Sequence, residues 1–276
     1  MKRIRLTIAY DGTDYAGFQV QPGQPTIEGE LNRALSELTG ENAAVIGASR
    51  TDSGVHALGN VAVFDTESPI PADRFGAALL PHLPDDIRIV CSGEVPIDWH
   101  PRHQHALKTY QYAISCGEVE NPLGRRYAAY IRRQLDVDAM REAASFLVGE
   151  HDFSSFANPS SQVLQAGGSA VRKIYGISIS ESGSRCSGRN ADVKEEGLGN
   201  NLFYPDLGTR QILIRITGNG FLYNMVRIIA GTLIQVGTGL WTPDRVREAL
   251  EAKDRRTAGP TAEARGLTLC GIEYET

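Results

Sequence analysis

Cysteine is scarce in this sequence, and a long apolar segment is absent from it. The four cysteines among 276 residues lie far apart and form no C-x-x-C pair. This spacing argues against a structural zinc site and against a disulfide framework, and it is typical of a reducing cytoplasm. No run of about 18 apolar residues occurs, which excludes a transmembrane helix. The opening MKRIRLTIAYDG has no apolar segment and no small-residue cleavage site, so we expect no secretory signal.

An excess of positive charge, common in nucleic-acid-binding proteins, is also lacking. The formal net charge is -5 at pH 7 and gives no support for a polyanionic partner. The 28 basic residues, however, comprise only five lysines and therefore 23 arginines. The planar arginine side chain binds phosphate in bidentate fashion and stacks on bases. Genomic composition produces the same bias, so charge alone leaves both explanations open.

The first half of the chain predicts the element order β-α-β-β-α-β. Apolar and polar residues alternate over 3–10, as in a strand with one solvated face. Thr26 is placed to cap a helix whose apolar residues share one face, and Gly40 is placed to end it. Further strands are expected at 43–48, 60–65 and 87–94, and a second helix at 71–80.

The second half repeats this order. Asp136 is placed to cap a helix that Gly149 ends. Two such units in tandem are typical of a ferredoxin-like, RNA-recognition-like plan. The predicted fold class is therefore α+β, with two antiparallel sheets that join, a central cleft, and subdomains at 1–106 and 107–276. Strands are expected at 109–115, 171–180, 211–217 and 267–274, and helices at 221–236 and 243–252.

Three segments are expected to be loops. Residues 11–25 follow the first strand, and residues 157–170 are rich in serine, glycine and glutamine. Residues 181–209 are rich in serine, glycine, asparagine and charge. We interpret this last segment as a surface insertion between two strands.

A polar cluster with one carboxylate separates two predicted strands. The segment 48–58 reads ASRTDSGVHAL and holds Asp52 between Arg50 and His56. Because the cluster is short, Asp52 is expected at the end of the sheet, where an ionised carboxylate needs a cationic or N–H partner. An Asp-Ser-Gly triplet is also common in plain turns. This segment alone therefore does not identify a site.

Two features of the second half bear on the same question. In the segment 108–112 (KTYQY), Tyr110 and Tyr112 share one face of a strand. The apolar segment FLYNMVRII contains Arg227, and an arginine in such a stretch is seldom buried without a carboxylate. The alternative is that its side chain extends to the surface. The sequence is compatible with both arrangements.

Several motifs together resemble one enzyme family. The segments YDGTDYAGFQVQ, SRTDSGVHALGNVAVF, DWHPRHQHALKTYQY, HDFSSF and NGFLYNMVRIIAGTL are similar to those of the TruA family of tRNA pseudouridine synthases. They occur in the family's order and cover nearly the whole chain, and RTDSGVHA is highly specific to that family. Ser49 stands where the family usually has glycine, and Phe18 where it often has tryptophan.

The resemblance implies a cofactor-free isomerisation of uridine to pseudouridine. The N1–C1′ bond breaks, the base turns over, and C5 joins C1′, which agrees with the lack of a dinucleotide or phosphate-loop motif. By resemblance, Asp52 is the catalytic aspartate, as a nucleophile or as a base at C2′. Arg227 pairs with it, and Tyr110 packs against the target base and helps remove the C5 proton. Base flipping is implied, with Arg50 as the residue that props or replaces the flipped base.

The implied substrate is uridine at position 38, 39 or 40 in the anticodon stem-loop of tRNA, and the implied assembly is a homodimer. Recognition of adjacent positions favours reading by shape and phosphate. In the segment 125–133 (RRYAAYIRR), Arg125 and Arg126 are candidate phosphate contacts, although a solvated edge strand has the same pattern. His56 is a further candidate for substrate binding.

Three other interpretations stay open. One is a non-catalytic RNA-binding protein of two RNA-recognition-like units, although an RNP1-like pattern is missing. The second is a hydrolase that pairs Asp52 with Asp11 or Asp14, which requires two acids at a set separation. The third is a metal site at His100, His103 and His105; the segment PRHQHAL that holds the last two contains no acidic or cysteine residue, and we expect no metal.

Overall fold

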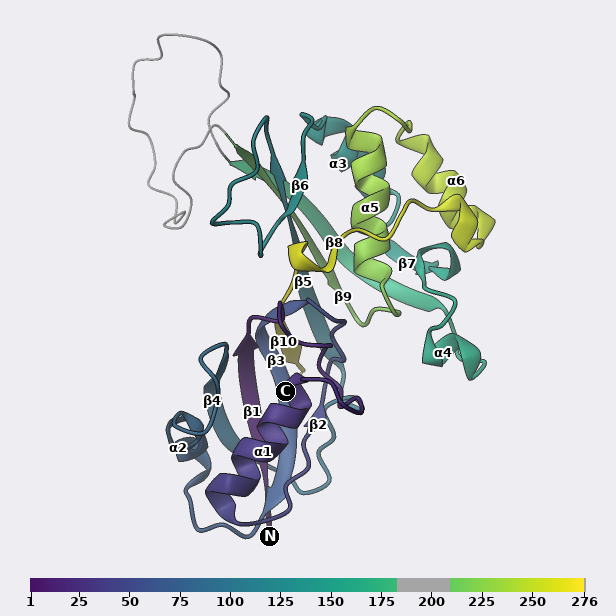
Figure 1. The fold of residues 1–276 in the computed structure, drawn as a ribbon. Helices are drawn as coiled ribbons and strands as arrows, with labels where there is room; N and C mark the ends of the chain where they lie inside the picture. Colours follow the sequence, from purple (N-terminus) through teal and green to yellow (C-terminus); the bar gives the residue numbers. More distant parts are fainter. Residues whose placement is uncertain (183–208, 276) are drawn as a thin grey trace.

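A single mixed sheet organises the structure, a computed structural model that describes residues 1–182 and 209–275 (Figure 1). Its strands are β1 (Lys2–Tyr10), β2 (Ile46–Gly47), β3 (His56–Thr66), β4 (Ile87–Val95), β5 (Ala106–Cys116), β6 (Ala129–Ile131), β7 (Gly149–Asp152), β8 (Val171–Ser182), β9 (Arg210–Gly218) and β10 (Leu267–Tyr274). The order along the sheet is β4-β1-β3-β10-β5-β9-β8-β7, with β2 beside β3 and β6 beside β5. Within the described residues, every pair is antiparallel except β3–β10 and β5–β6.

Helices lie over both halves of this sheet. Figure 1 shows α1 along the strands of the first half, and α3, α5 and α6 grouped over the second. No helix in the described ranges is long and apolar enough to cross a membrane. The helices are α1 (Ile27–Thr39), α2 (Phe75–Leu79), α3 (Val137–Ser145), α4 (Gln162–Gln165), α5 (Met225–Gly237) and α6 (Asp244–Ala252), with short 3₁₀ turns at Ala72–Arg74, Ser154–Phe156, Arg255–Thr257 and Ala264–Gly266.

The predicted α+β class with one joined sheet is confirmed, and most predicted elements occur within a few residues of their expected positions. Thr26 caps α1 by accepting from the Gly29 N–H at 3.2 Å, and Gly40 ends it in the left-handed region at φ 73°. The tandem repetition and the subdomain boundary after residue 106 stay predictions. The expected insertion at 181–209 lies almost entirely outside the described residues.

Three boundaries differ from the prediction for local reasons. The strand expected at 43–48 shortens to the two residues of β2. Gly149 does not end α3: the helix stops at Ser145, and Gly149, at φ 115°, turns the chain into β7. Asn224, at φ 61°, delays the start of α5 to Met225 because a left-handed residue cannot lie within a helix. Strands β6 and β7 and helix α4 were not expected from the sequence.

The core of the first half follows from the alternation in β1. Ile4, Leu6 and Ile8 are fully buried, and so are Leu31 and Leu35 of α1. Burial of each such side chain contributes about 1.5–3 kcal/mol. Every second residue of β1 and residues four apart in α1 thus form two apolar faces, and both faces belong to one core.

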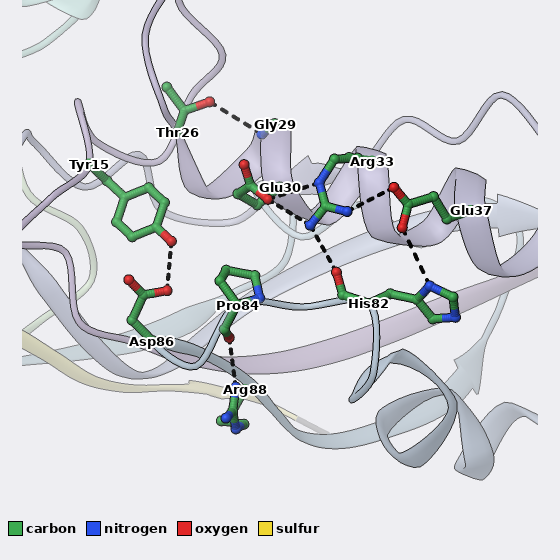
Figure 2. A network of polar contacts seen from close by, with 10 residues as sticks. All are labelled: Tyr15, Thr26, Gly29, Glu30, Arg33, Glu37, His82, Pro84, Asp86 and Arg88. Carbon is green, nitrogen blue, oxygen red and sulfur yellow. Dashed lines mark hydrogen bonds and ion pairs between the residues drawn. The ribbon is translucent and has the colours of Figure 1, made fainter.

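Polar contacts fix α1 and the loop before it (Figure 2). Arg33 donates to Glu30 and Glu37 of its own helix and, at 2.8 Å, to the carbonyl of His82. Tyr15 of the loop 11–25 donates its hydroxyl hydrogen to Asp86 at 2.6 Å. The Tyr15 carbonyl in turn accepts from the Ser53 hydroxyl at 3.1 Å. The loop is therefore anchored on one side and holds the polar cluster around Asp52 on the other.

A close approach between α5 and the chain before β10 depends on Gly231. A Cβ at this position would lie 1.9 Å from the Pro260 carbonyl oxygen. The approach brings the Ala262 N–H to 3.1 Å from the Arg227 carbonyl. We expect Gly231→Ala to lower the free energy of unfolding by about 1–3 kcal/mol, because overpacking against backbone outweighs the gain in helix propensity.

Urea unfolding measures this change. Gly93→Ala in β4 is the matched control, because a Cβ there has no neighbour within 4 Å. A Gly231→Ala protein as stable as the unchanged chain would contradict the close approach.

Candidate active site

A cavity of about 1010 Å³ opens where segments of both halves meet. Asp52, Ser49 and Arg50 line it from the first half. Tyr110 of β5 and the turn before α5 line it from the second. Among the described residues that line the cavity, Asp52 is the only carboxylate. The predicted central cleft therefore contains one acid group.

The segment that carries Asp52 is held on both sides. On one side, the Ser49 carbonyl accepts from the Asn60 side chain at 3.0 Å. On the other, the Thr51 carbonyl accepts from the Phe18 N–H at 3.0 Å. The Asp52 carbonyl closes a tight turn by accepting from the Val55 N–H at 3.1 Å. The Asn60 side chain of β3 and the Phe18 N–H of the loop 11–25 thus fix the segment that holds the carboxylate at the end of the sheet.

Asp52 forms an ion pair with Arg227. The Arg227 Nη1 lies 3.3 Å from the Asp52 Oδ2, and the two side chains are 18% and 17% exposed. Arg227 does not itself line the cavity; its Nε donates to the Ala262 carbonyl at 2.8 Å, and its Nη1 also donates to the Asn224 side chain at 3.1 Å. The sequence left two arrangements open for Arg227, and the structure has the buried one, with a carboxylate partner.

Two opposing effects set the acidity of Asp52. Burial raises the pKa of this carboxyl above its ordinary value, and the Arg227 guanidinium opposes that rise. The net pKa is raised. A carboxylate in this state is more basic than a solvated one, and the Arg227 guanidinium balances its negative charge. Such a group is suited to proton abstraction or to nucleophilic attack.

Tyr110 faces the same cavity. Its side chain is 8% exposed, and its ring meets Phe221 edge-on at a centroid distance of 5.2 Å. Burial raises the pKa of the Tyr110 phenol to about 12, while the Ser49 hydrogen bond lowers it and nearby Asp52 raises it further. Tyr112, on the same strand face, is fully buried and donates to the Glu263 carbonyl at 2.9 Å, so it belongs to the core.

Three cations line the cavity without an ion-pair partner among the described residues: Arg50, Arg102 and Lys108. Arg50 donates to the Gln162 side chain at 2.8 Å, and Lys108 donates to the Ala48 carbonyl at 2.9 Å. Burial, together with the charge of Arg102, lowers the pKa of Lys108 to about 8. Lys108 and Arg102 were not predicted as site residues. The spacing of two between Lys108 and Tyr110 is the sequence signal that places both on one face.

The other predicted binding residues lie outside the cavity. His56 is 4% exposed, its Nδ1 accepts from the Gly12 N–H at 3.1 Å, and its Nε2 lies 3.0 Å from the Arg126 carbonyl. These contacts tie the loop 11–25 to the turn at 122–127. Arg126 pairs with Asp14 at 3.3 Å, and Arg125 donates to the Pro122 carbonyl. His56, Arg125 and Arg126 do not line the cavity, and the substrate-binding roles predicted for them stay predictions.

The geometry bears on two of the alternative interpretations. Asp11 contacts Thr13 and Tyr127, and neither Asp11 nor Asp14 lines the cavity with Asp52, so the acid pair of a hydrolase is not formed there. The His100 and His103 rings stack at a centroid distance of 3.9 Å. No group of three metal-ligating side chains gathers among residues 1–182 and 209–275.

Comparison with known proteins agrees with this geometry. The sequence profile described as tRNA pseudouridine synthase matches residues 6–104 and 143–275. The tRNA pseudouridine synthase A of Brevibacillus brevis is 44% identical over 274 residues, covering 99% of this chain and 100% of that protein. Proteins of the same name from Shouchella clausii and Ruminiclostridium cellulolyticum are each 42% identical to this chain over 99% of its length. The match covers 94% of the first protein and 100% of the second. The residues matched by this profile include Asp52 and Arg227 but not Tyr110, and the chain belongs to the tRNA pseudouridine synthase family.

Proposed function

We propose that this chain isomerises uridine to pseudouridine at positions 38, 39 and 40 in the anticodon stem-loop of tRNA, without a cofactor, through Asp52 acting on a flipped uridine. The observation that carries the proposal is the ion pair of Asp52 and Arg227, at 3.3 Å, together with the cavity that Asp52 and the phenol of Tyr110 both line. Asp52 comes from the proposed subdomain 1–106, and Tyr110 and Arg227 come from 107–276. We place the reaction in the cytoplasm, where tRNA is found.

The chemistry assigns a task to each of these groups. Asp52 acts on the nucleotide as a nucleophile or as a base at C2′, and either task requires an ionised carboxylate. Arg227 keeps that carboxylate charged although it is largely buried. Tyr110 packs against the base and takes part in removing the proton from C5. The reaction moves a glycosyl bond within one molecule and therefore requires no oxidant and no phosphoryl donor.

The cations of the cavity support a polyanionic substrate. Arg50, Arg102 and Lys108 have no ion-pair partner among the described residues, and Arg102 lies near enough to Lys108 to lower the pKa of its ammonium. An RNA backbone relieves such repulsion. A uridine stacked in a stem cannot reach the largely buried Asp52, so the base must flip out. Arg50, exposed at the cavity, is the candidate to prop or replace it.

Tritium release tests the function. A tRNA transcript labelled with tritium at uridine C5 is incubated with the protein, and a second transcript has cytidine at positions 38, 39 and 40. We expect release from the first transcript and none from the second. Tight binding of both without release would instead support the non-catalytic RNA-binding protein.

We predict that Arg125 and Arg126 contact phosphate. The double variant Arg125→Glu, Arg126→Glu is expected to bind tRNA at least about 10-fold more weakly and to reduce the salt slope of binding by about 2, because two phosphate contacts are lost. Filter binding at several salt concentrations measures both quantities. The matched control is Arg245→Glu, Arg247→Glu, because these arginines lie on α6 and pair with acids, as Arg126 does. An unchanged slope in the first variant would contradict the prediction.

We also predict a homodimer in which one tRNA touches both subunits. Sedimentation velocity at micromolar concentration is expected to show a species of about twice the mass of the 30.0 kDa chain. A profile of monomer alone would count against this assembly.

A further inference from the structure

Ser49 connects two functional groups in the wall of the cavity. Its Oγ lies 3.0 Å from the Tyr110 hydroxyl and 3.3 Å from the Lys108 Nζ. The serine comes from the segment between β2 and β3, and its two partners come from β5. Ser49 itself is 6% exposed. Glycine, the residue that the resemblance implies at this position, has no hydroxyl and could not form these contacts.

The direction of these hydrogen bonds follows from their chemistry. A lysine ammonium donates and cannot accept, so the Ser49 oxygen accepts from Lys108. In the described part of the chain, the Ser49 Oγ has no other side-chain or carbonyl partner than Tyr110 to which its hydrogen can go. A buried hydroxyl without an acceptor is costly. The Ser49–Tyr110 contact allows either hydroxyl to donate; when Ser49 donates, the Tyr110 oxygen accepts and its own hydrogen points away from Ser49.

We propose that Ser49 is a positioning residue that, with Lys108 behind it, prepares the Tyr110 oxygen to take the proton from C5 of the uridine. The proposal rests on the proposed function. When Ser49 donates to Tyr110, the residues Lys108, Ser49 and Tyr110 form one hydrogen-bonded chain in which each hydrogen bond points toward the phenol oxygen. Such an arrangement stabilises negative charge on that oxygen.

The transfer of protons between Tyr110 and the base neither gains nor loses a proton overall. Once C5 has joined C1′, the tyrosine passes its own hydroxyl proton to N1 of the turned base, and the phenolate remains hydrogen-bonded to Ser49. The phenolate oxygen then takes the proton from C5, and the electron pair of the C5–H bond returns to the ring as the C5=C6 double bond. One proton leaves C5, one arrives at N1, and the tyrosine is restored. No oxidant, reductant or further reactant takes part.

Groups from each neighbouring element act on the phenol. Burial and the charge of Asp52 disfavour the phenolate, and the Ser49 hydrogen bond favours it. Lys108, on the same strand, contributes positive charge through Ser49, and Arg102 in turn faces Lys108. On the α5 side, Phe221 packs edge-on against the ring, and Arg227 is occupied with Asp52. Among the described residues, Ser49 is therefore the side chain that hydrogen-bonds the Tyr110 hydroxyl directly.

The test is single-turnover pseudouridine formation with Ser49→Ala, on tRNA that carries either hydrogen or deuterium at C5 of the target uridine. We expect a rate about 10-fold lower or more, the effect of one hydrogen bond to a charged group. The deuterium isotope effect should be above 1 and at least as large as in the unchanged chain, because proton removal is the step that slows. Lys108→Met should change both quantities in the same direction.

Ser145→Ala is the matched control, since Ser145 lies at the end of α3, outside the cavity, and donates to the Glu142 carbonyl. It should keep the rate and the isotope effect. Circular dichroism and tRNA affinity establish that each variant is folded. An unchanged rate in Ser49→Ala, or a lower rate with an isotope effect that falls toward 1, would overturn the role of Ser49. Failure of the unchanged chain to form pseudouridine would instead refute the proposed function.

Discussion

Asp52→Ala is expected to lower tritium release from uridine C5 by on the order of 10⁴-fold, while tRNA affinity changes only a few-fold. The reason is that Asp52 is the only carboxylate among the described residues that line the cavity, so no neighbouring acid can replace it. Binding is retained because the cations of the cavity wall are unchanged. Release assays under single-turnover conditions and filter binding measure the two effects separately.

Two further variants make this result specific. Asp52→Asn keeps the shape of the side chain and removes its charge, and it should be as inactive as Asp52→Ala. Asp73→Ala removes an exposed carboxylate in the 3₁₀ turn at Ala72–Arg74 and should be as active as the unchanged chain. Substantial release by Asp52→Asn would show that the carboxylate is not required, and the proposed mechanism would fail.

Arg227→Met is expected to lower the rate of release by roughly 10²- to 10³-fold at neutral pH, with part of the loss recovered as the pH rises. Burial raises the pKa of Asp52, and Arg227 counteracts this effect. Without the guanidinium the pKa of Asp52 rises further, so a higher pH is needed to ionise it. The acid limb of the pH–rate profile should therefore move to higher pH.

Two substitutions serve as comparison. Arg227→Lys keeps a positive charge but cannot reproduce the planar arrangement that reaches Asp52, Asn224 and the Ala262 carbonyl together, so an intermediate rate is expected. Arg247→Met on α6 removes an exposed arginine that pairs with Asp244, and it should have no effect. A pH profile of Arg227→Met that keeps the position of its acid limb would show that Arg227 does not act through Asp52.

The fold was predictable where local signals determine it. The alternation in β1 and the cap and stop residues of α1 are properties of a few neighbouring residues, and both elements occur as expected. The predicted start of α5 was wrong, because an apolar stretch does not indicate that Asn224 adopts a left-handed conformation. The early end of α3 was missed because glycine has two uses, as a helix stop and as a turn into a strand, and Gly149 serves the second.

The site was predictable as a set of residues but not as an arrangement. Asp52, Tyr110 and Arg227 became candidates through the family resemblance, and the structure brings the three together; their catalytic roles stay proposals. The hydrogen bonds of Ser49 join residues about sixty positions apart in the sequence. Such contacts depend on how β5 lies relative to the segment before β3, which no local pattern specifies. For the same reason, the sequence did not separate His56 from the cavity.

The position of β10 has a consequence for how the protein is made. This strand lies between β3 and β5 and is the joint between the two halves of the sheet (Figure 1). A ribosome synthesises β10 long after both of its neighbours, so a nascent chain holds two partial sheets that nothing yet connects. Asp52 and Tyr110 therefore acquire a common rigid support only late in synthesis. A ribosome-bound chain that lacks β10 would hold Asp52 and Tyr110 on two partial sheets that this strand does not yet join, and modification would await its synthesis.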